Sequence, residues 1–256
     1  MYSLNARFFI VSIFACILLL ILPLIMEQKK KLPFDVWYPY DYKIAPLYIV
    51  TYAHQTLTAS YVTLSQLGID TFSAGLMAVV GCQCALLEDR MMNFDENIVD
   101  FDQLFREIAD HHAQILKLAK KLNKLVSFYA FAQMGLCVLL FCTALFRLSV
   151  IETTSPEFLA VIVYIVAVKI QLFLYCWFGN EVTVYSSRLH LAAFHCNWIG
   201  SPISFQKKLI LFLGKTANPI KIRAINFIPM SILTFSTIMK NSWSYFAVLQ
   251  QVHNRM

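Results

Sequence analysis

Long apolar runs separated by polar segments dominate the pattern of this chain. Five runs are long enough to cross a membrane, since a helix needs about 20 mainly apolar residues to span the hydrocarbon core. Their approximate bounds are 8–25, 44–67, 125–147, 158–178 and 227–252. The pattern predicts an all-α fold: a polytopic membrane protein with five transmembrane helices and further helices outside the membrane, forming one domain over residues 1–256.

The first run could instead belong to a signal peptide, because a basic residue, Arg7, precedes it. Its apolar core is longer than the roughly 7–15 residues of such a peptide, and no small-residue cleavage site follows. We therefore expect a retained span.

The second run continues beyond its span, from Ile44 to Leu87. As one helix this stretch would be about 66 Å long, roughly twice the thickness of a bilayer core. Two spans would need a turn, and Gly68 with Asp70 is the only candidate, a weak one. We expect one helix that crosses the membrane over 44–67 and continues into the cytosol.

The polar segment 88–124 carries apolar positions at intervals of three and four, which predicts an amphipathic helix against a protein surface. These positions are Phe101, Leu104, Phe105, Ile108, His112, Ile115, Ala119 and Leu122. His111 and His112 invite a metal interpretation. Adjacent side chains point about 100° apart on a helix, so a solvated helix face is the ordinary interpretation.

A second polar segment, 179–226, predicts a short helix over 204–213 between Pro202 and Gly214. Lys169 lies near the middle of the span before it. A lysine there marks either an internal cavity or a side chain that reaches the membrane surface, and the sequence does not separate these.

The last run has a polar seam along its length. At 100° per residue the seam comprises Ser236, Thr237, Lys240, Ser244, Val248 and Gln251. The opposite side comprises Phe235, Ile238, Met239, Phe246 and Leu249. A helix that lines a water-filled path sorts its residues in this way, and so does a helix whose polar side packs on other helices. Periodicity alone leaves both interpretations open.

Composition confirms the membrane class and orients the chain. Hydrophobic residues make up 59% and charged residues 14%, against roughly 25% charged in soluble domains. Segments 1–7, 88–124 and 179–226 hold 13 lysines and arginines and the intervening segments hold 6, so the first set is predicted to be cytosolic and the C-terminus extracellular. The net charge of +6 is scattered among apolar runs, which argues against nucleic acid.

Candidate chemistry is sparse. None of the seven cysteines falls in a predicted extracellular segment, so no disulfide framework is expected. No nucleophile and base pair, phosphate loop or metal-ligand spacing stands out, and we expect no enzyme activity, cofactor or metal.

Three short stretches resemble insect odorant receptors. They are LPF-x-x-WYP at 32–39, GNEVTVYSSRLHLAAFHCNW at 179–198 and SYFAVLQQV at 244–252. The last is similar to a Thr-Tyr, five apolar residues, Gln-Phe signature shared with gustatory receptors. Ser244 and Val252 depart conservatively from it, and Gln251 is in register.

The resemblance implies a seven-span receptor with a cytosolic N-terminus and an extracellular C-terminus, in the plasma membrane of olfactory sensory neurons. Such receptors assemble as heterotetramers with an odorant co-receptor into ligand-gated, non-selective cation channels that bind small volatile organic ligands and contact membrane lipid. The five runs correspond to the family's third to seventh spans, so this chain would be an N-terminally truncated tuning receptor. A non-conducting or regulatory fragment, a gustatory-type receptor and a receptor that acts through a G protein are the alternatives.

The resemblance also implies three sites. A cytosolic anchor that holds four subunits together would comprise about 68–124 and 199–226. The gate would comprise Val248 and Val252 with the pore-lining Gln251, and Ser236, Thr237, Lys240 and Ser244 would lie on the pore face, where a lysine is unusual for a cation path. The odorant pocket would be lined by Phe14, Ile17, Leu18, Tyr52, Gln55, Ala59 and Tyr164, for each of which ordinary helix packing is the alternative.

Overall fold

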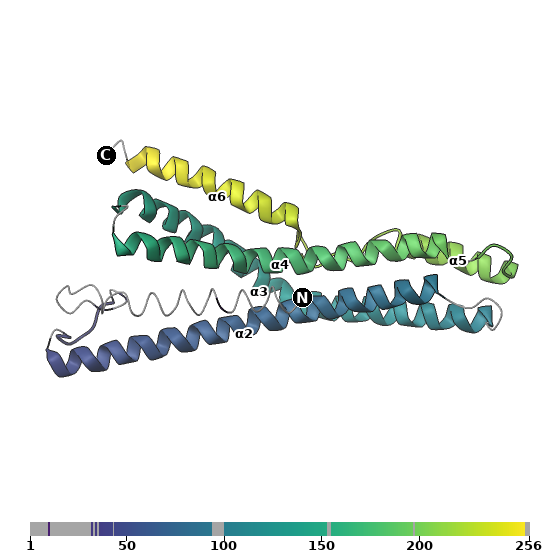
Figure 1. The fold of residues 1–256 in the computed structure, drawn as a ribbon, viewed down its shortest axis with the longest axis horizontal. Coiled ribbons are helices and arrows are strands. Elements are labelled where there is room, and N and C mark those ends of the chain that lie inside the picture. The colour runs from purple at the N-terminus through teal and green to yellow at the C-terminus, as the bar shows by residue number, and fades with distance from the viewer. Residues whose placement is uncertain are drawn as a thin grey trace. The chain divides into compact units, whose positions relative to one another are not determined.

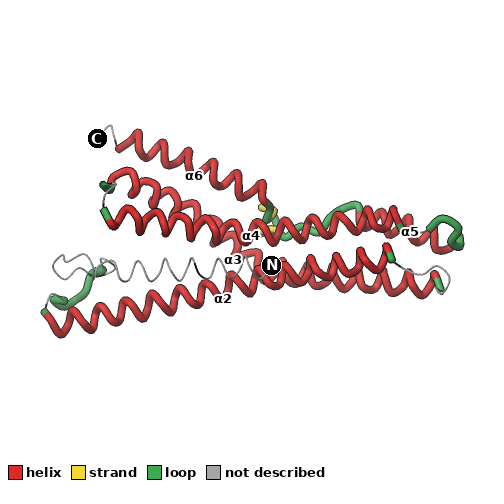
Figure 2. Tube along the Cα trace, viewed as in Figure 1, coloured by secondary structure: helices red, strands yellow, loops and turns green. Residues whose placement is uncertain are grey.

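The structure is a computed structural model that describes residues 10, 32, 34, 36–42, 44–93, 100–152, 155–196 and 198–253. Its elements are α2 (Ala45–Met92), α3 (Phe101–Val150), α4 (Pro156–His195), α5 (Ile203–Thr216), the strands β1 (Arg223–Ala224) and β2 (Ile228–Pro229), and α6 (Ile232–His253) (Figure 1). Figure 2 shows helix almost everywhere in the described part, which confirms the all-α class. The predicted first span, with Phe14, Ile17 and Leu18, lies outside the described residues.

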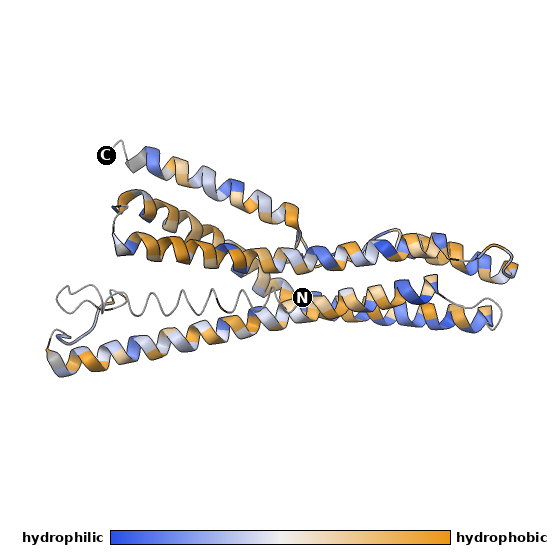
Figure 3. Ribbon diagram, viewed as in Figure 1, coloured by the Kyte–Doolittle hydropathy of each residue, from blue (hydrophilic) through white to orange (hydrophobic). Residues whose placement is uncertain are grey.

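Two long helices each join segments of different polarity. α2 is continuous over 48 residues and passes through Gly68 and Asp70 without a turn, as predicted. α3 unites the predicted amphipathic helix with the span that follows it in 50 residues. In Figure 3 the C-terminal part of α3 and the N-terminal part of α4 are the most continuously hydrophobic.

Three helix ends differ from their predicted positions. α4 continues past residue 178 to His195, and α5 continues through Gly214 to Thr216, where the Ala217 N–H still bonds to the carbonyl of Leu213. α6 begins at Ile232, later than the predicted residue 227. The Ser231 hydroxyl accepts the N–H of Thr234 at 3.2 Å and so caps the helix there.

Among the described residues, α2, α3 and α4 are long and apolar enough to cross a membrane. α6, at 22 residues, is not among them. The reason is that Lys240 and Asn241 interrupt its apolar residues, which lowers its hydropathy.

The chain divides into two compact units. The first comprises 1–72, 136–172 and 239–256, and the second comprises 73–135 and 173–238. The second unit has a dense core of large side chains, which includes Met77, Leu87, Ile115, Leu189, Phe205 and Ile222. The predicted apolar face of 101–122 belongs to this unit: Ile108, His112, Ile115, Ala119 and Leu122 are buried, and the other three residues are half-buried.

Candidate functional site

The polar seam of α6 faces away from the rest of the chain. All six seam residues are exposed, Val248 to 57%. On the opposite side Phe235, Ile238, Met239 and Phe246 are half-buried and Ser242 is fully buried. Nothing is described for the side chains of Leu249 and Val252. The seam is therefore not used for packing on the described part of the chain.

Two contacts hold the packed side of α6. In the first unit the Cys142 thiol donates to the carbonyl of Ser242 at 3.6 Å, which joins α3 to α6. In the second unit the rings of Phe173 and Phe235 meet edge to face at 5.4 Å between centroids, which joins α4 to the first turn of α6. These contacts fix which side of α6 turns outward.

The seam hydroxyls are partly satisfied by their own helix. Thr237 Oγ1 donates to the carbonyl of Leu233 at 2.9 Å, and Ser244 Oγ donates to that of Lys240 at 3.2 Å. The donor proton of each hydroxyl is therefore satisfied, and the acceptor lone pairs stay available to water. The exposed Lys240 ammonium is the group on the seam that most needs water or a partner.

The odorant-pocket residues that are described lie in the first unit. Tyr52, Ala59 and Tyr164 are half-buried, and Gln55 is buried. The amide of Gln55 binds both the N–H and the carbonyl of Phe34, at 3.1 and 3.0 Å, and donates to the Tyr38 hydroxyl at 3.1 Å. Gln55 therefore joins Phe34 and Tyr38 to α2, a role that the sequence did not indicate.

Asp70 lies on α2 and is only 2% exposed. Gln171 Nε2 donates to its Oδ2 at 2.6 Å, and Gln66 Nε2 donates to its Oδ1 at 3.3 Å. The bond to Gln171 ties α2 to α4. A carboxylate in an apolar run was the only sequence signal for this cluster.

Other charged candidates are resolved by their exposure. Lys169 is exposed, which favours a side chain that reaches out of the chain over one in an internal cavity.

His112, in contrast, is buried with its ring 5.1 Å from that of Phe212, so the prediction of a solvated helix face is wrong for it. His111 bonds to Gln83 Oε1 at 3.0 Å. No cluster of metal-ligating side chains occurs in the described part of the chain.

Burial lowers the pKa of both histidines. For His112 the desolvation is reinforced by the positive charges of Lys215 and His111, and for His111 by that of Arg90. Nearby, a hydrogen bond from Lys208 Nζ at 2.7 Å holds the pKa of Asp102 below its usual value. At the contact between α3 and α5, the surroundings therefore favour the neutral form of His112 and the ionised form of Asp102.

The β-hairpin before α6 packs tightly on α4. The N–H of Met230 bonds to the carbonyl of Ile222 at 2.9 Å. A Cβ on Gly179 would lie 2.5 Å from the Cβ of Met230 and 2.6 Å from its carbonyl oxygen. Only glycine permits this approach, which positions the start of α6.

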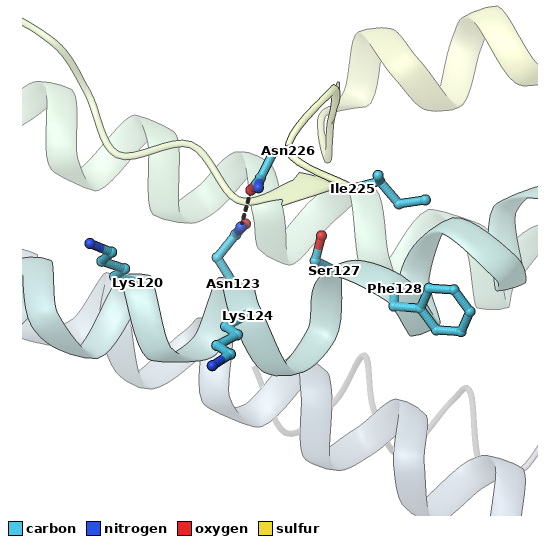
Figure 4. A pocket seen from close by; sticks show the side chains of 7 residues that line it. All are labelled: Lys120, Asn123, Lys124, Ser127, Phe128, Ile225 and Asn226. Carbon is cyan, nitrogen blue, oxygen red and sulfur yellow. Dashed lines mark hydrogen bonds between the residues drawn. The ribbon is translucent and has the colours of Figure 1, made fainter.

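A pocket of about 490 Å³ lies between α3 and the hairpin turn (Figure 4). Its polar lining is Lys120, Asn123, Lys124, Ser127 and Asn226, and its apolar lining is Phe128 and Ile225. The side chain of Asn123 points to Asn226 and donates to its Oδ1 at 3.0 Å (Figure 4). The sequence offered no signal for this pocket because its two sides are about a hundred residues apart.

Long apolar helices and an outward polar seam define a polytopic helical membrane protein. A family model described as "7tm Odorant receptor" matches residues 1–243. The chain therefore belongs to the 7tm odorant receptor family, and the resemblance seen in the sequence is confirmed. The relatives are receptors, not enzymes.

Similar proteins and structures agree with this assignment. The chain is 26% identical to Odorant receptor 94a of Drosophila melanogaster over 89% of its own length and 28% identical to Odorant receptor 10 of Aedes albopictus over 88%. It covers 60% and 61% of those two proteins, so it spans about three fifths of these relatives. The olfactory receptor OR5 of Machilis hrabei in complex with eugenol has the same fold, with a TM-score of 0.88 at 18% identity over 98% of this chain and 66% of that one. A second structure of the olfactory receptor OR5 from Machilis hrabei gives a TM-score of 0.80 at 16% identity.

Proposed function

We propose that this chain is an odorant-binding subunit of a ligand-gated, non-selective cation channel that acts in olfactory transduction together with a co-receptor, in the plasma membrane of olfactory sensory neurons. The observation that carries the proposal is the orientation of α6, whose polar seam is exposed along its length while the opposite side packs on the chain. One helix cannot enclose a path, so several copies or partners must contribute. Family membership supports the same conclusion.

Val248 is the proposed gate residue, with Gln251 beside it and Val252 one turn further on. A ring of valines blocks ions because a narrow apolar constriction sheds its water. The odorant would bind among Phe14, Ile17, Leu18, Tyr52, Gln55, Ala59 and Tyr164. Apolar burial with few directional bonds suits small volatile ligands.

Co-expression with an odorant co-receptor, followed by current recording under an odorant panel, tests the proposal. We expect odorant-evoked cation current that neither protein gives alone. Because the chain spans three fifths of its relatives, a chimera that carries the upstream segment of a relative is recorded in parallel. Absence of evoked current from both forms, with surface delivery verified, would contradict the proposal and favour a non-conducting regulatory subunit.

Substitution at Val248 separates a gate from a packing surface. Val248→Ser, made in whichever of the two forms conducts, should raise the current measured without odorant, because a ring of serines at the constriction keeps its water. Trp243→Ser is the matched control, since Trp243 is also exposed but lies about 140° around the helix. Equal baselines in the two variants would place the gate elsewhere.

A further inference from the structure

The pocket between α3 and the hairpin has a rigid floor. The Asn123 side chain accepts the N–H of Arg223 at 2.7 Å and donates to Asn226, and the Ile225 N–H donates to the carbonyl of Ser127 at 3.3 Å. The turn closes on itself through the Phe227 N–H and the carbonyl of Ala224 at 3.0 Å. The pocket walls are therefore fixed relative to each other within the second unit.

The turn carries backbone strain at the pocket wall. Ile225 and Asn226 have φ of 47° and 57°, the left-handed region. Asparagine adopts this conformation readily, but a β-branched residue such as isoleucine does so only under strain. The chain thus holds an apolar side chain at the pocket rim where glycine would be less strained.

The polar end of the pocket is positively charged. Lys120 and Lys124 line it, no carboxylate does, and neither ammonium has an ion-pair partner among the described residues. Figure 4 shows the two side chains on opposite sides of α3, with Lys120 on the side of the hairpin and Lys124 on the other side. The surrounding sequence adds to this charge, because no acidic residue occurs between Asp110 and Glu152.

The other end of the pocket is apolar. Figure 4 places Phe128 and Ile225 together at the end away from Lys120. Phe128 is 77% exposed, and the exposed Leu125 and Phe131 continue the apolar surface along α3. The surface changes from lysine to exposed hydrocarbon within about one helical turn, the pattern of a helix entering the bilayer.

From this placement we propose that the pocket binds the headgroup of an anionic phospholipid from the cytosolic leaflet. Lys120 would pair with the phosphate, and Lys124 would add positive potential at the edge of the pocket. The amide and hydroxyl groups of Asn226 and Ser127 would bond to the phosphate oxygens, and Phe128 with Ile225 would contact the first methylenes of the acyl chains. Basic pockets on the cytosolic side of membrane helices suit such headgroups. A soluble anion would make no favourable contact with the exposed apolar end of the pocket. This proposal is independent of channel activity.

Lipid retention by the purified protein tests the proposal. The protein is delipidated, incubated with phosphatidylcholine vesicles that contain one fifth phosphatidylserine, re-purified, and its bound lipid is counted by mass spectrometry. Wild type should enrich phosphatidylserine over its share in the vesicles. In the double variant Lys120→Gln, Lys124→Gln the bound share of phosphatidylserine should fall to about its share in the vesicles.

Two further variants separate the pocket from general charge. Lys117→Gln with Lys121→Gln removes the same charge from exposed positions of the same helix that do not line the pocket, and it should keep the enrichment. Ser127→Phe fills the pocket without changing the charge and should abolish the phosphatidylserine enrichment. Thermal melting of each variant checks that it is folded.

Other outcomes would overturn the proposal. An equal loss of phosphatidylserine enrichment in the Lys120, Lys124 and the Lys117, Lys121 variants would mean diffuse electrostatic attraction. No enrichment by wild type would mean that the pocket binds no anionic lipid. Displacement of the lipid by millimolar inorganic phosphate would mean a soluble-anion site. A change of oligomeric state in the Lys120, Lys124 variant, with lipid retention unchanged, would assign the pocket to a neighbouring subunit.

Discussion

α5 and α6 flank the same β-hairpin but bury their side chains very differently. α5, with 14 residues, buries Phe205, Leu209, Phe212 and Thr216. α6, with 22 residues, fully buries only Ser242 among its described side chains. Most helical stability in proteins comes from a packed face, so α5 gains more of its stability from packing on its own chain than α6 does. The two helices therefore differ in how much of their surface is left exposed.

The largest expected effect comes from the buried face of α5. Phe205 is 1% exposed, and its ring lies 5.1 Å from that of Phe101 and 6.2 Å from that of Phe105. Phe205→Ala should destabilise the second unit by about 3–5 kcal/mol, because it removes a large side chain and leaves a cavity. Thermal melting of the purified chain measures this.

The matched substitution on α6 is Leu233→Ala, at a residue that is 77% exposed. Its effect on the isolated chain should stay within about 0.5 kcal/mol. Comparable losses in the two variants would break the distinction between the helices.

A smaller effect is expected where α6 is positioned by the hairpin. Gly179→Ala would force a Cβ into the backbone of Met230, at a cost of about 1–3 kcal/mol. Gly135→Ala, on α3, meets nothing within 4 Å and should be neutral or stabilising by up to about 1 kcal/mol. The melting temperatures of the two variants should therefore move in opposite directions or differ clearly, and a harmless Gly179→Ala would mean that the hairpin is not held at this point.

The contact of α5 with α3 should weaken in acid. Folding lowers the pKa of His112 below 6.5, so the folded chain binds fewer protons than the unfolded chain. Stability is then complete above the unfolded pKa of about 6.5 and falls as pH drops towards the folded value. His111 contributes in the same direction.

Melting temperature measured between pH 7.5 and 5.5 tests this dependence. His112→Leu should flatten the slope, because the ring that resists protonation is gone. If the change of melting temperature with pH is the same in His112→Leu as in wild type, groups other than His112 cause it.

The smallest effect is expected on the exposed side of α5. Lys208 and Asp102 form a 2.7 Å ion pair in solvent, and the pair lowers the pKa of Asp102. Its stabilisation is present above the unfolded pKa of the carboxyl group and is lost as pH falls through the folded pKa. Lys208→Gln should lower the melting temperature slightly at low salt and not at high salt, and Lys207→Gln should do neither.

Local pattern determined the helices and their faces. The 3.6-residue period placed the seam of α6 on one side and Phe235, Ile238, Met239 and Phe246 on the other, and the exposures confirm that arrangement. A weak turn signal at Gly68 did not break α2, and the buried positions of 101–122 were in register. These features depend on neighbours within one or two helical turns, which a sequence displays directly.

Tertiary structure decided what distant residues do to one another. The start of α6 depends on the hairpin and on the approach of Gly179 to Met230, and Gln171 meets Asp70 across 101 residues. The Asn123 to Asn226 bond that builds the basic pocket spans 103 residues. No local period records such pairs, because each is fixed only when whole helices pack and bring their side chains to within bonding distance.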